Sequence, residues 1–253
     1  MTELVHRSSG TGAPVVLLHG NPTSSHLWRN VMPSLPGRLL APDLIGMGSS
    51  PRPDIEYTFD DHARYLDAWF DALALDDVVL IGHDWGGALA ADWASRHPSR
   101  VRALAFTEAV LKPMTWEEFP PAGAELFRAL KTPGVGESLV EDFLPPEYAF
   151  QDRRPVLQWT RSMPLGGEPA AVVARIEAFG RWLASSPAVP KLLVTFEPGH
   201  GTMLTPSMVE WCASTFASLE VVRRPEKAGH HTPEDQPEAL VSTLAEWLAG
   251  LPS

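Results

Sequence analysis

The sequence predicts an α/β protein with a mostly parallel sheet, helices on both faces of that sheet, and a helical insertion. Three observations support this prediction. Short runs of branched apolar residues alternate with helical stretches, as in a parallel sheet that is covered on both faces. One such run, residues 78–81, leads through a sharp glycine turn directly into a helix-forming segment. The alternation stops between residues 112 and 187, where prolines and aromatic residues are frequent, and then resumes.

Composition narrows the class of protein. The chain has 253 residues, of which 44% are hydrophobic, and this suffices for one substantial core with an insertion. The formal net charge of -11 argues against nucleic acid or an anionic membrane as a partner. The single cysteine, Cys212, excludes an intrachain disulfide and agrees with a reducing compartment. The chain shows neither a signal peptide nor an apolar run that could span a bilayer, so we expect a cytoplasmic protein.

The elements of the first half follow from their apolar patterns. Strands are expected over residues 3–8, 15–18, 39–44, 78–81 and 101–106, with helices over 60–74 and from residue 86. Ligands of a parallel sheet bind at the carboxyl ends of its strands. Asn21, Asp84 and Glu108 each come shortly after a predicted strand. We therefore expect these three side chains to converge at one edge of the sheet.

The second half begins with the insertion and returns to the sheet. Helices are expected over residues 118–130 and 170–184, strands over 191–196 and 219–223, and a final helix over 234–249. The aromatic residues of the insertion could line an apolar pocket or simply hold the insertion together; they are Trp116, Phe119, Phe127, Phe143, Trp159 and Trp182. We expect a core domain of residues 1–111 and 188–253, and a helical cap of residues 112–187.

The turn over residues 82–86, Gly-His-Asp-Trp-Gly, is where chemistry is expected. A strand, a tight turn and a helix in this order hold a strained, exposed nucleophile at the end of a sheet. The central residue here is Asp84. Backbone N–H groups at the helix start favour a carboxylate, which can displace a leaving group from a saturated carbon and form an alkyl ester. The alternative is that Asp84 only caps the helix.

Four segments together resemble the haloalkane dehalogenases, which are enzymes of the α/β-hydrolase fold. These segments are HGNPTSS at residues 19–25, APDLIGMG at 41–48, HDWG at 83–86, and His230 followed by Glu234 and Asp235. The resemblance covers nearly the whole chain. It implies hydrolysis of a small halogenated hydrocarbon to an alcohol and a halide ion by water, without a cofactor. It points to the subfamily whose catalytic acid is a glutamate after the sixth strand of the family's sheet, the position of Glu108. The residues themselves show no cluster with metal-ligand spacing.

The resemblance implies a role for each of five side chains. Asp84 attacks the carbon that bears the halogen, while the Asn21 amide and the Trp85 indole N–H donate hydrogen bonds to the departing halide. His230 then activates a water molecule, and Glu108 orients the imidazole and stabilises its cation. The backbone N–H groups of Asn21 and Trp85 hold the oxyanion.

Nearby residues compete for two of these roles. Glu197 also follows a predicted strand and could reach the histidine, and His231 adjoins His230. The resemblance favours Glu108 as the acid and His230 as the base, with Glu197 as a nearby support. His83 is expected to shape its turn rather than to take part in the chemistry.

The chain departs from the family pattern in two places. Family members usually have another strand before the one expected at residues 3–8. Its absence could expose a sheet edge that pairs with a second copy in a homo-oligomer. The stretch from residue 141 to residue 155 is shorter than in the family by about one helix and a loop. We therefore expect a shallow, open pocket, with Phe143 and Pro164 as the cap residues that contact substrate and halide.

Other activities share part of the pattern. Epoxide hydrolases of this fold also use an aspartate, but they need two cap tyrosines, and the expected cap contains one, Tyr148. Fluoroacetate dehalogenases place an arginine after the nucleophile, where this chain has Trp85. Coelenterazine luciferases share the catalytic triad, so an oxygenase stays open. A binding module that has lost turnover is a further alternative, against which the intact set of site residues argues.

Overall fold

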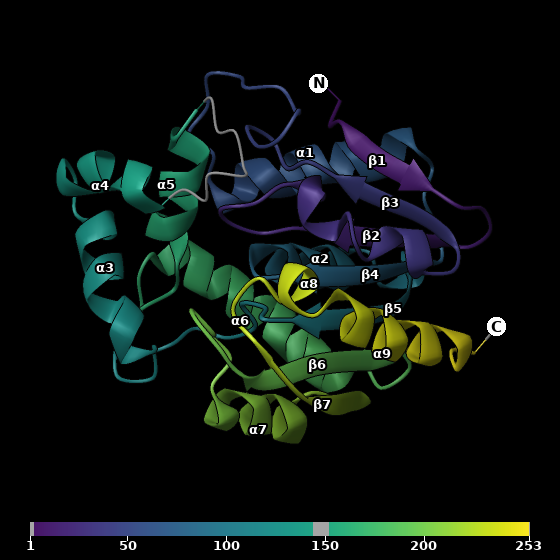
Figure 1. Ribbon diagram of the computed structural model, residues 1–253. Coiled ribbons are helices and arrows are strands. Elements are labelled where there is room, and N and C mark those ends of the chain that lie inside the picture. The colour runs from purple at the N-terminus through teal and green to yellow at the C-terminus, as the bar shows by residue number, and fades with distance from the viewer. Residues whose placement is uncertain (1–2, 144–151, 253) are drawn as a thin grey trace.

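A seven-stranded sheet forms the centre of the computed structural model, which describes residues 3–252 except 144–151. The strand order is β1-β3-β2-β4-β5-β6-β7, and among the described strands only β1 runs antiparallel to its neighbour (Figure 1). The strands are β1 (His6–Ser9), β2 (Pro14–Leu18), β3 (Arg38–Pro42), β4 (Val78–His83), β5 (Val101–Thr107), β6 (Lys191–Pro198) and β7 (Leu219–Ala228). The predicted mostly parallel sheet is confirmed.

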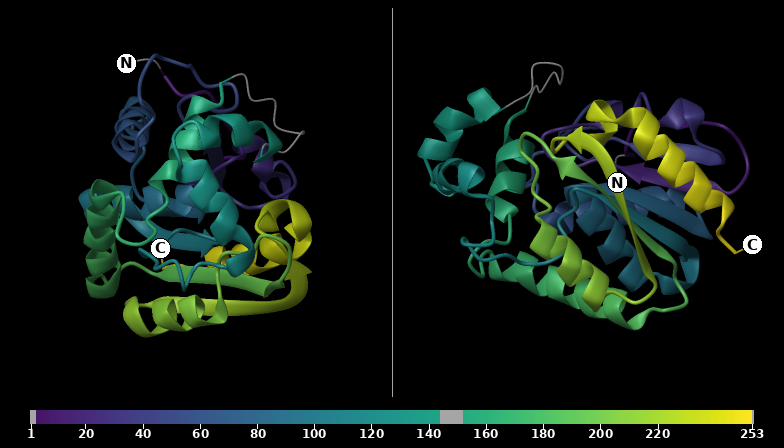
Figure 2. Two further views of the ribbon diagram at one scale, coloured as in Figure 1. Left: turned by 90° about the vertical axis from the view of Figure 1, so that its left-hand side faces the viewer. Right: turned by 60° about the horizontal axis from the view of Figure 1, so that its bottom comes forward.

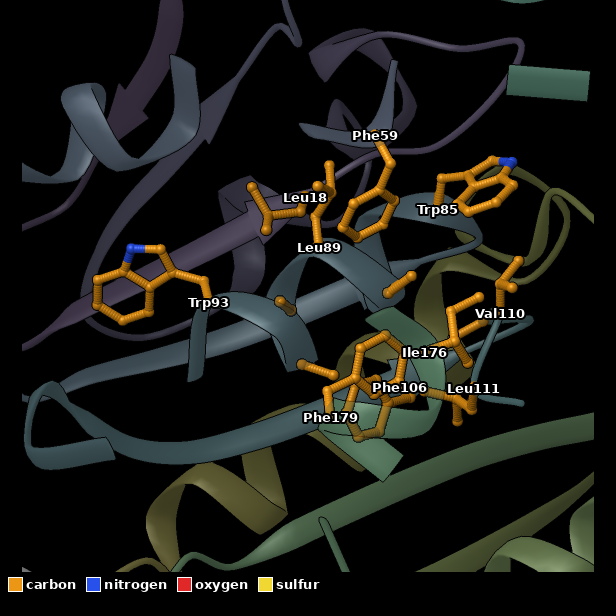
Figure 3. Close-up of a cluster of buried hydrophobic side chains, with 14 of the residues drawn as sticks. Leu18, Phe59, Trp85, Leu89, Trp93, Phe106, Val110, Leu111, Ile176 and Phe179 are labelled. Atoms are coloured by element: carbon orange, nitrogen blue, oxygen red, sulfur yellow. The ribbon is translucent and has the colours of Figure 1, made fainter. Parts of the chain in front are cut away.

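Alternate residues of the central strands point to opposite faces of the sheet and build two separate cores. Val16 and Leu18 of β2 belong to one core, whereas Val15 and Leu17 belong to the other. The first core is covered by α1 (Phe59–Ala72), α2 (Trp85–Arg96), α6 (Ala170–Ser185) and α7 (Pro206–Thr215). Figure 3 shows part of it, where Leu18 lies with side chains of α1, α2 and α6. The second core is covered by α9 (Pro237–Ala249) and the short 3-10 segments η1 (Ser25–Trp28) and η2 (Met32–Ser34). Helices therefore cover both faces, as predicted.

The ends of the first helix follow from local chemistry. The Thr58 hydroxyl accepts from the Asp61 N–H, and the Asp61 carboxylate accepts from the Thr58 N–H, so a capping box starts α1. The expected helix over residues 60–74 ends at Ala72 because Ala74 has a positive φ of 47°. The helix thus stops before the strand β4 that carries the sharp turn.

The insertion contains more helix than its sequence pattern indicates. The helix expected over residues 118–130 begins at Pro121 as α3 (Pro121–Lys131), because Thr115 and Glu118 bond to each other in a preceding turn. Two further helices were not predicted: α4 (Val135–Phe143) and α5 (Arg154–Ser162). Figures 1 and 2 show that α3 and α4 stand beyond one end of the sheet, while α5 lies nearer to it.

The last part of the insertion joins the main body of the fold. The α6 helix packs along α2, and the Arg175 guanidinium bonds the carboxylates of Asp60 and Asp92 at 2.7 and 3.3 Å. The expected final helix over residues 234–249 is divided into α8 (Thr232–Asp235) and α9, with Gln236 between them. None of the helices in the described ranges is long and apolar enough to cross a membrane.

Candidate active site

Asp84 stands in the sharp turn between β4 and α2. Its φ and ψ angles are 51° and −125°, a conformation that ordinary residues rarely adopt. Glycines make room for the turn: a Cβ atom on Gly86 would lie 2.2 Å from the Leu18 carbonyl oxygen. A Cβ on Gly20 would lie 2.3 Å from Asp84 Oδ2. The elbow predicted from the sequence is present, and only 3% of Asp84 is exposed.

The surroundings of Asp84 set the charge of its carboxylate. The Asn21 N–H donates a hydrogen bond to Asp84 Oδ2 over 2.7 Å, which leaves Oδ1 available for reaction. Burial raises the pKa of Asp84 to about 6, although the positive charge of His230 and the backbone N–H groups of Asn21 and Trp85 act against this rise. The carboxylate is therefore ionised above about pH 6 and poorly hydrated, which makes it a stronger nucleophile than an exposed aspartate.

His230 lies between two carboxylates. Its Nδ1 is 3.3 Å from Glu108 Oε2, and its Nε2 is 3.9 Å from Asp84 Oδ1. Burial lowers the pKa of His230, but the hydrogen bond to Glu108 and the charges of Asp84 and Glu108 outweigh it, so the net pKa lies above 6.5. Glu108 follows β5 directly and accepts a 2.6 Å hydrogen bond from the Met203 N–H. Glu197, the competing acid, is exposed to solvent at the end of β6.

The backbone of His230 is fixed on both sides. Its N–H donates to the His200 carbonyl over 3.0 Å, and its carbonyl accepts from His83 Nε2 over 2.7 Å. Burial lowers the pKa of His83 well below 6.5, so this ring is neutral and its single proton lies on Nε2. Sequence reasoning expected His83 only to shape its turn, whereas the ring also bonds the loop that carries His230. The hydrogen bond from the Met203 N–H to Glu108 was not predicted, because a backbone donor leaves no signal in a sequence.

Asn21 and Trp85, the two side chains expected to donate hydrogen bonds to the halide, lie under the cap helix α5. The Asn21 side-chain Nδ2 donates to the Val156 carbonyl over 3.2 Å and lies 3.4 Å from Thr160 Oγ1. The Trp85 ring is stacked on Trp159, with 4.6 Å between ring centroids and 29° between planes. The structure thus brings Asn21, Trp85, Asp84, Glu108 and His230 to one edge of the sheet. The contact between Asn21 and Thr160 was not anticipated.

Of the two cap residues predicted to line the pocket, Phe143 and Pro164, the structure describes the side chain of Pro164 alone. Pro164 is buried, and its carbonyl accepts from the Met114 N–H over 2.9 Å, which joins the start of the insertion to its later part. Phe143 ends α4, but its side chain lies outside the described residues, as does Tyr148. Pocket contacts by Phe143 and Pro164, and the open pocket expected from the short cap, therefore stay predictions.

We expect Glu108→Gln to lower kcat by about 10²- to 10⁴-fold, because the imidazolium loses its charged partner. Since Glu108 raises the pKa of His230, its removal should lower that pKa and move the acid limb of the pH–kcat profile to lower pH. Glu197→Gln is the matched control. If Glu197→Gln shifts the profile and Glu108→Gln does not, the acid has been assigned to the wrong strand end.

Comparison with known proteins shows which family the chain is similar to. A family model described as alpha/beta hydrolase fold matches residues 13–188. A haloalkane dehalogenase of Agrobacterium fabrum is 42% identical over 94% of this chain and 86% of its own length. A haloalkane dehalogenase of Mesorhizobium japonicum is 40% identical over 95% of this chain and 86% of its own length. The crystal structure of the haloalkane dehalogenase DatA from Agrobacterium tumefaciens C58 matches with a TM-score of 0.88 and 41% identity, over 96% of this chain and 91% of that one. The crystal structure of the haloalkane dehalogenase DbeA from Bradyrhizobium elkani USDA94 matches with a TM-score of 0.89 and 39% identity, over 97% of this chain and 93% of that one.

Proposed function

The chain belongs to the haloalkane dehalogenases of the α/β-hydrolase fold, and we propose that it breaks carbon–halogen bonds with Asp84 as nucleophile, His230 as base and Glu108 as acid. One observation carries this assignment of roles. The two nitrogens of His230 lie 3.3 Å from Glu108 and 3.9 Å from Asp84, at the strand ends where the elbow presents its carboxylate. The order nucleophile, acid, histidine along the chain is that of α/β-hydrolases.

In the first step, Asp84 Oδ1 attacks the carbon that bears the halogen. A C–O bond forms as the C–X bond breaks, and the halide leaves with the electron pair. Oδ2 stays bound to the Asn21 N–H. The Asn21 amide and the Trp85 indole N–H donate to the halide. Because both donors are neutral, they stabilise the developing charge without holding the ion so firmly that release fails.

In the second step, His230 Nε2 takes a proton from water, and the resulting hydroxide attacks the Asp84 carboxyl carbon. Negative charge then develops on Oδ2, to which the Asn21 N–H already donates. The Trp85 N–H, which also bonds the Asp84 carboxylate, is assigned to the same oxyanion. The bond between the carboxyl carbon and Oδ1 breaks, and the alkoxide takes a proton from the imidazolium and leaves as the alcohol. Asp84 keeps the oxygen of the hydroxide and returns to a carboxylate by losing the remaining water proton to solvent. Glu108 stabilises the imidazolium throughout.

The proposal also covers where the substrate binds, where the protein is located and how two copies could pair. We place the substrate, a small halogenated hydrocarbon, between the core domain (residues 1–111 and 188–253) and the cap (residues 112–187), where α5 lies against Asn21 and Trp85. The single, buried cysteine supports a cytoplasmic location. The formal net charge of -11 argues against nucleic-acid partners. Pairing of two copies would use β1, which lies at the edge of the described sheet.

The experiment that tests the proposed activity is halide release from a panel of brominated and iodinated alkanes, run beside epoxides of similar size. We expect stoichiometric halide and alcohol from the haloalkanes. A folded protein that opens epoxides and releases no halide would instead show that the same nucleophile serves epoxide hydrolysis.

A further inference from the structure

Thr160 lies on the cap helix directly above the two candidate halide donors. It is 1% exposed, and its Oγ1 lies 3.4 Å from Asn21 Nδ2. The preceding residue, Trp159, stacks on Trp85. Two consecutive residues of α5 therefore contact the two side chains to which the halide is assigned. An ion held by Asn21 and Trp85 together would lie under this part of the helix.

The hydrogen bonds of Asn21 leave one N–H for the halide. Its amide nitrogen carries two hydrogens, and one is used by the Val156 carbonyl at 3.2 Å. Nδ2 also contacts Thr160 Oγ1 at 3.4 Å, a separation longer than the usual 2.9–3.0 Å or so of an N–H···O bond. This long contact is one that a better acceptor, such as a halide ion, would replace.

The Thr160 hydroxyl can turn toward the same ion. It donates to the Val156 carbonyl over 3.1 Å, and a hydroxyl hydrogen rotates to suit its surroundings. If it turns away, the Val156 carbonyl still accepts from Asn21. Reorientation therefore leaves no buried carbonyl unpaired, and it places an O–H donor next to the side-chain amide of Asn21.

We propose that Thr160 is a third donor to the leaving halide, beside Asn21 and Trp85, and that it favours chloride over the larger halides. This inference rests on the proposed function. A hydroxyl donor stabilises a small ion with concentrated charge more than a large, diffuse one, so chloride gains most and iodide least. The alternative is that Thr160 only bonds the carbonyl four residues earlier, as buried helical threonines commonly do.

The test replaces the hydroxyl and measures halide binding without substrate. Thr160→Val keeps the shape and removes the donor, Thr160→Ser keeps the donor, and Thr160→Ala serves if the valine variant does not fold. Quenching of tryptophan fluorescence by chloride, bromide and iodide reports binding next to Trp85 and Trp159. We expect Thr160→Val to weaken chloride binding about tenfold, the size of one hydrogen bond to an ion, and iodide binding much less. The ratio of kcat/KM for a chloroalkane over its iodo analogue should fall in parallel.

Thr243 provides the matched control. It is a buried threonine of α9 whose hydroxyl bonds the Ala239 carbonyl over 3.0 Å, in the same way that Thr160 bonds Val156. Thr243→Val should leave halide binding unchanged, and Thr160→Ser should keep it. If wild type releases halide and Thr160→Val binds chloride as wild type does, the inference on Thr160 is overturned and the dehalogenase assignment stands. If the wild-type protein neither binds nor releases halide, the inference on Thr160 and the proposed dehalogenase function both fail.

Discussion

Asp84→Asn is expected to reduce halide release by about 10⁴-fold or more, because the amide has no charge with which to attack carbon. Asparagine has nearly the same shape as aspartate and tolerates a positive φ, so the elbow should keep its geometry. Its oxygen can still accept from the Asn21 N–H, as Asp84 Oδ2 does now. Initial rates on freshly purified protein measure the effect, since slow deamidation of the new asparagine would restore activity.

Asp92→Asn is the control for that experiment. Asp92 is also a buried carboxylate of α2, but it pairs with Arg96 and Arg175 and lies outside the proposed site. Its replacement should leave the rate per folded molecule within a few-fold of wild type. A rate for Asp84→Asn within tenfold of wild type would mean that another group attacks the carbon.

His230→Phe is expected to separate the two steps of the reaction. Displacement of halide needs only Asp84 and the halide donors, whereas hydrolysis of the ester needs the base. The variant should therefore release one equivalent of halide and then stop, with the alkyl group held on the protein. Intact-mass measurement after mixing with a bromoalkane would show an increase equal to the alkyl group.

Two controls make the trapping result specific. The double variant Asp84→Asn with His230→Phe should show no mass increase, because it has no nucleophile. His231→Phe should turn over with little change, since His231 lies beside Glu234 at 3.5 Å rather than beside Glu108. Continued halide release with no adduct would argue that water attacks the substrate directly. If the alkyl adduct accumulated in His231→Phe and not in His230→Phe, His231 would be the base.

Much of the fold was predictable from residue patterns, because buried parallel strands need continuous apolar runs. The runs at residues 15–18, 78–81 and 101–106 correspond to β2, β4 and β5. The helices α4, α5 and α7 were missed. They are 9 or 10 residues long, shorter than α1, α2, α3 and α6, and prolines lie at the starts of α5 and α7. The gap between α8 and α9 was missed because the apolar residues of the expected helix begin only at Ala239 and do not mark where the helix starts.

The candidate site was predictable where the strand ends carry the side chains. Asp84 and Glu108 directly follow β4 and β5, which are parallel neighbours in the sheet, so topology alone brings them to one edge. The contacts from elsewhere were not predictable. The Met203 N–H reaches Glu108 from a loop after β6, and Thr160 reaches Asn21 from a helix whose position depends on packing of the whole cap. Such contacts are set by tertiary structure and leave no periodic signal.

The most direct test of the central claim is a single turnover in H₂¹⁸O, with enzyme in excess over a bromoalkane. If Asp84 forms an ester that water attacks at the carboxyl carbon, the alcohol carries the unlabelled oxygen of Asp84. The heavy oxygen then appears in the peptide that contains Asp84, as mass spectrometry of the digested protein would show. If the alcohol carries the heavy oxygen and the peptide stays unlabelled, water has displaced the halide directly and Asp84 is not the nucleophile.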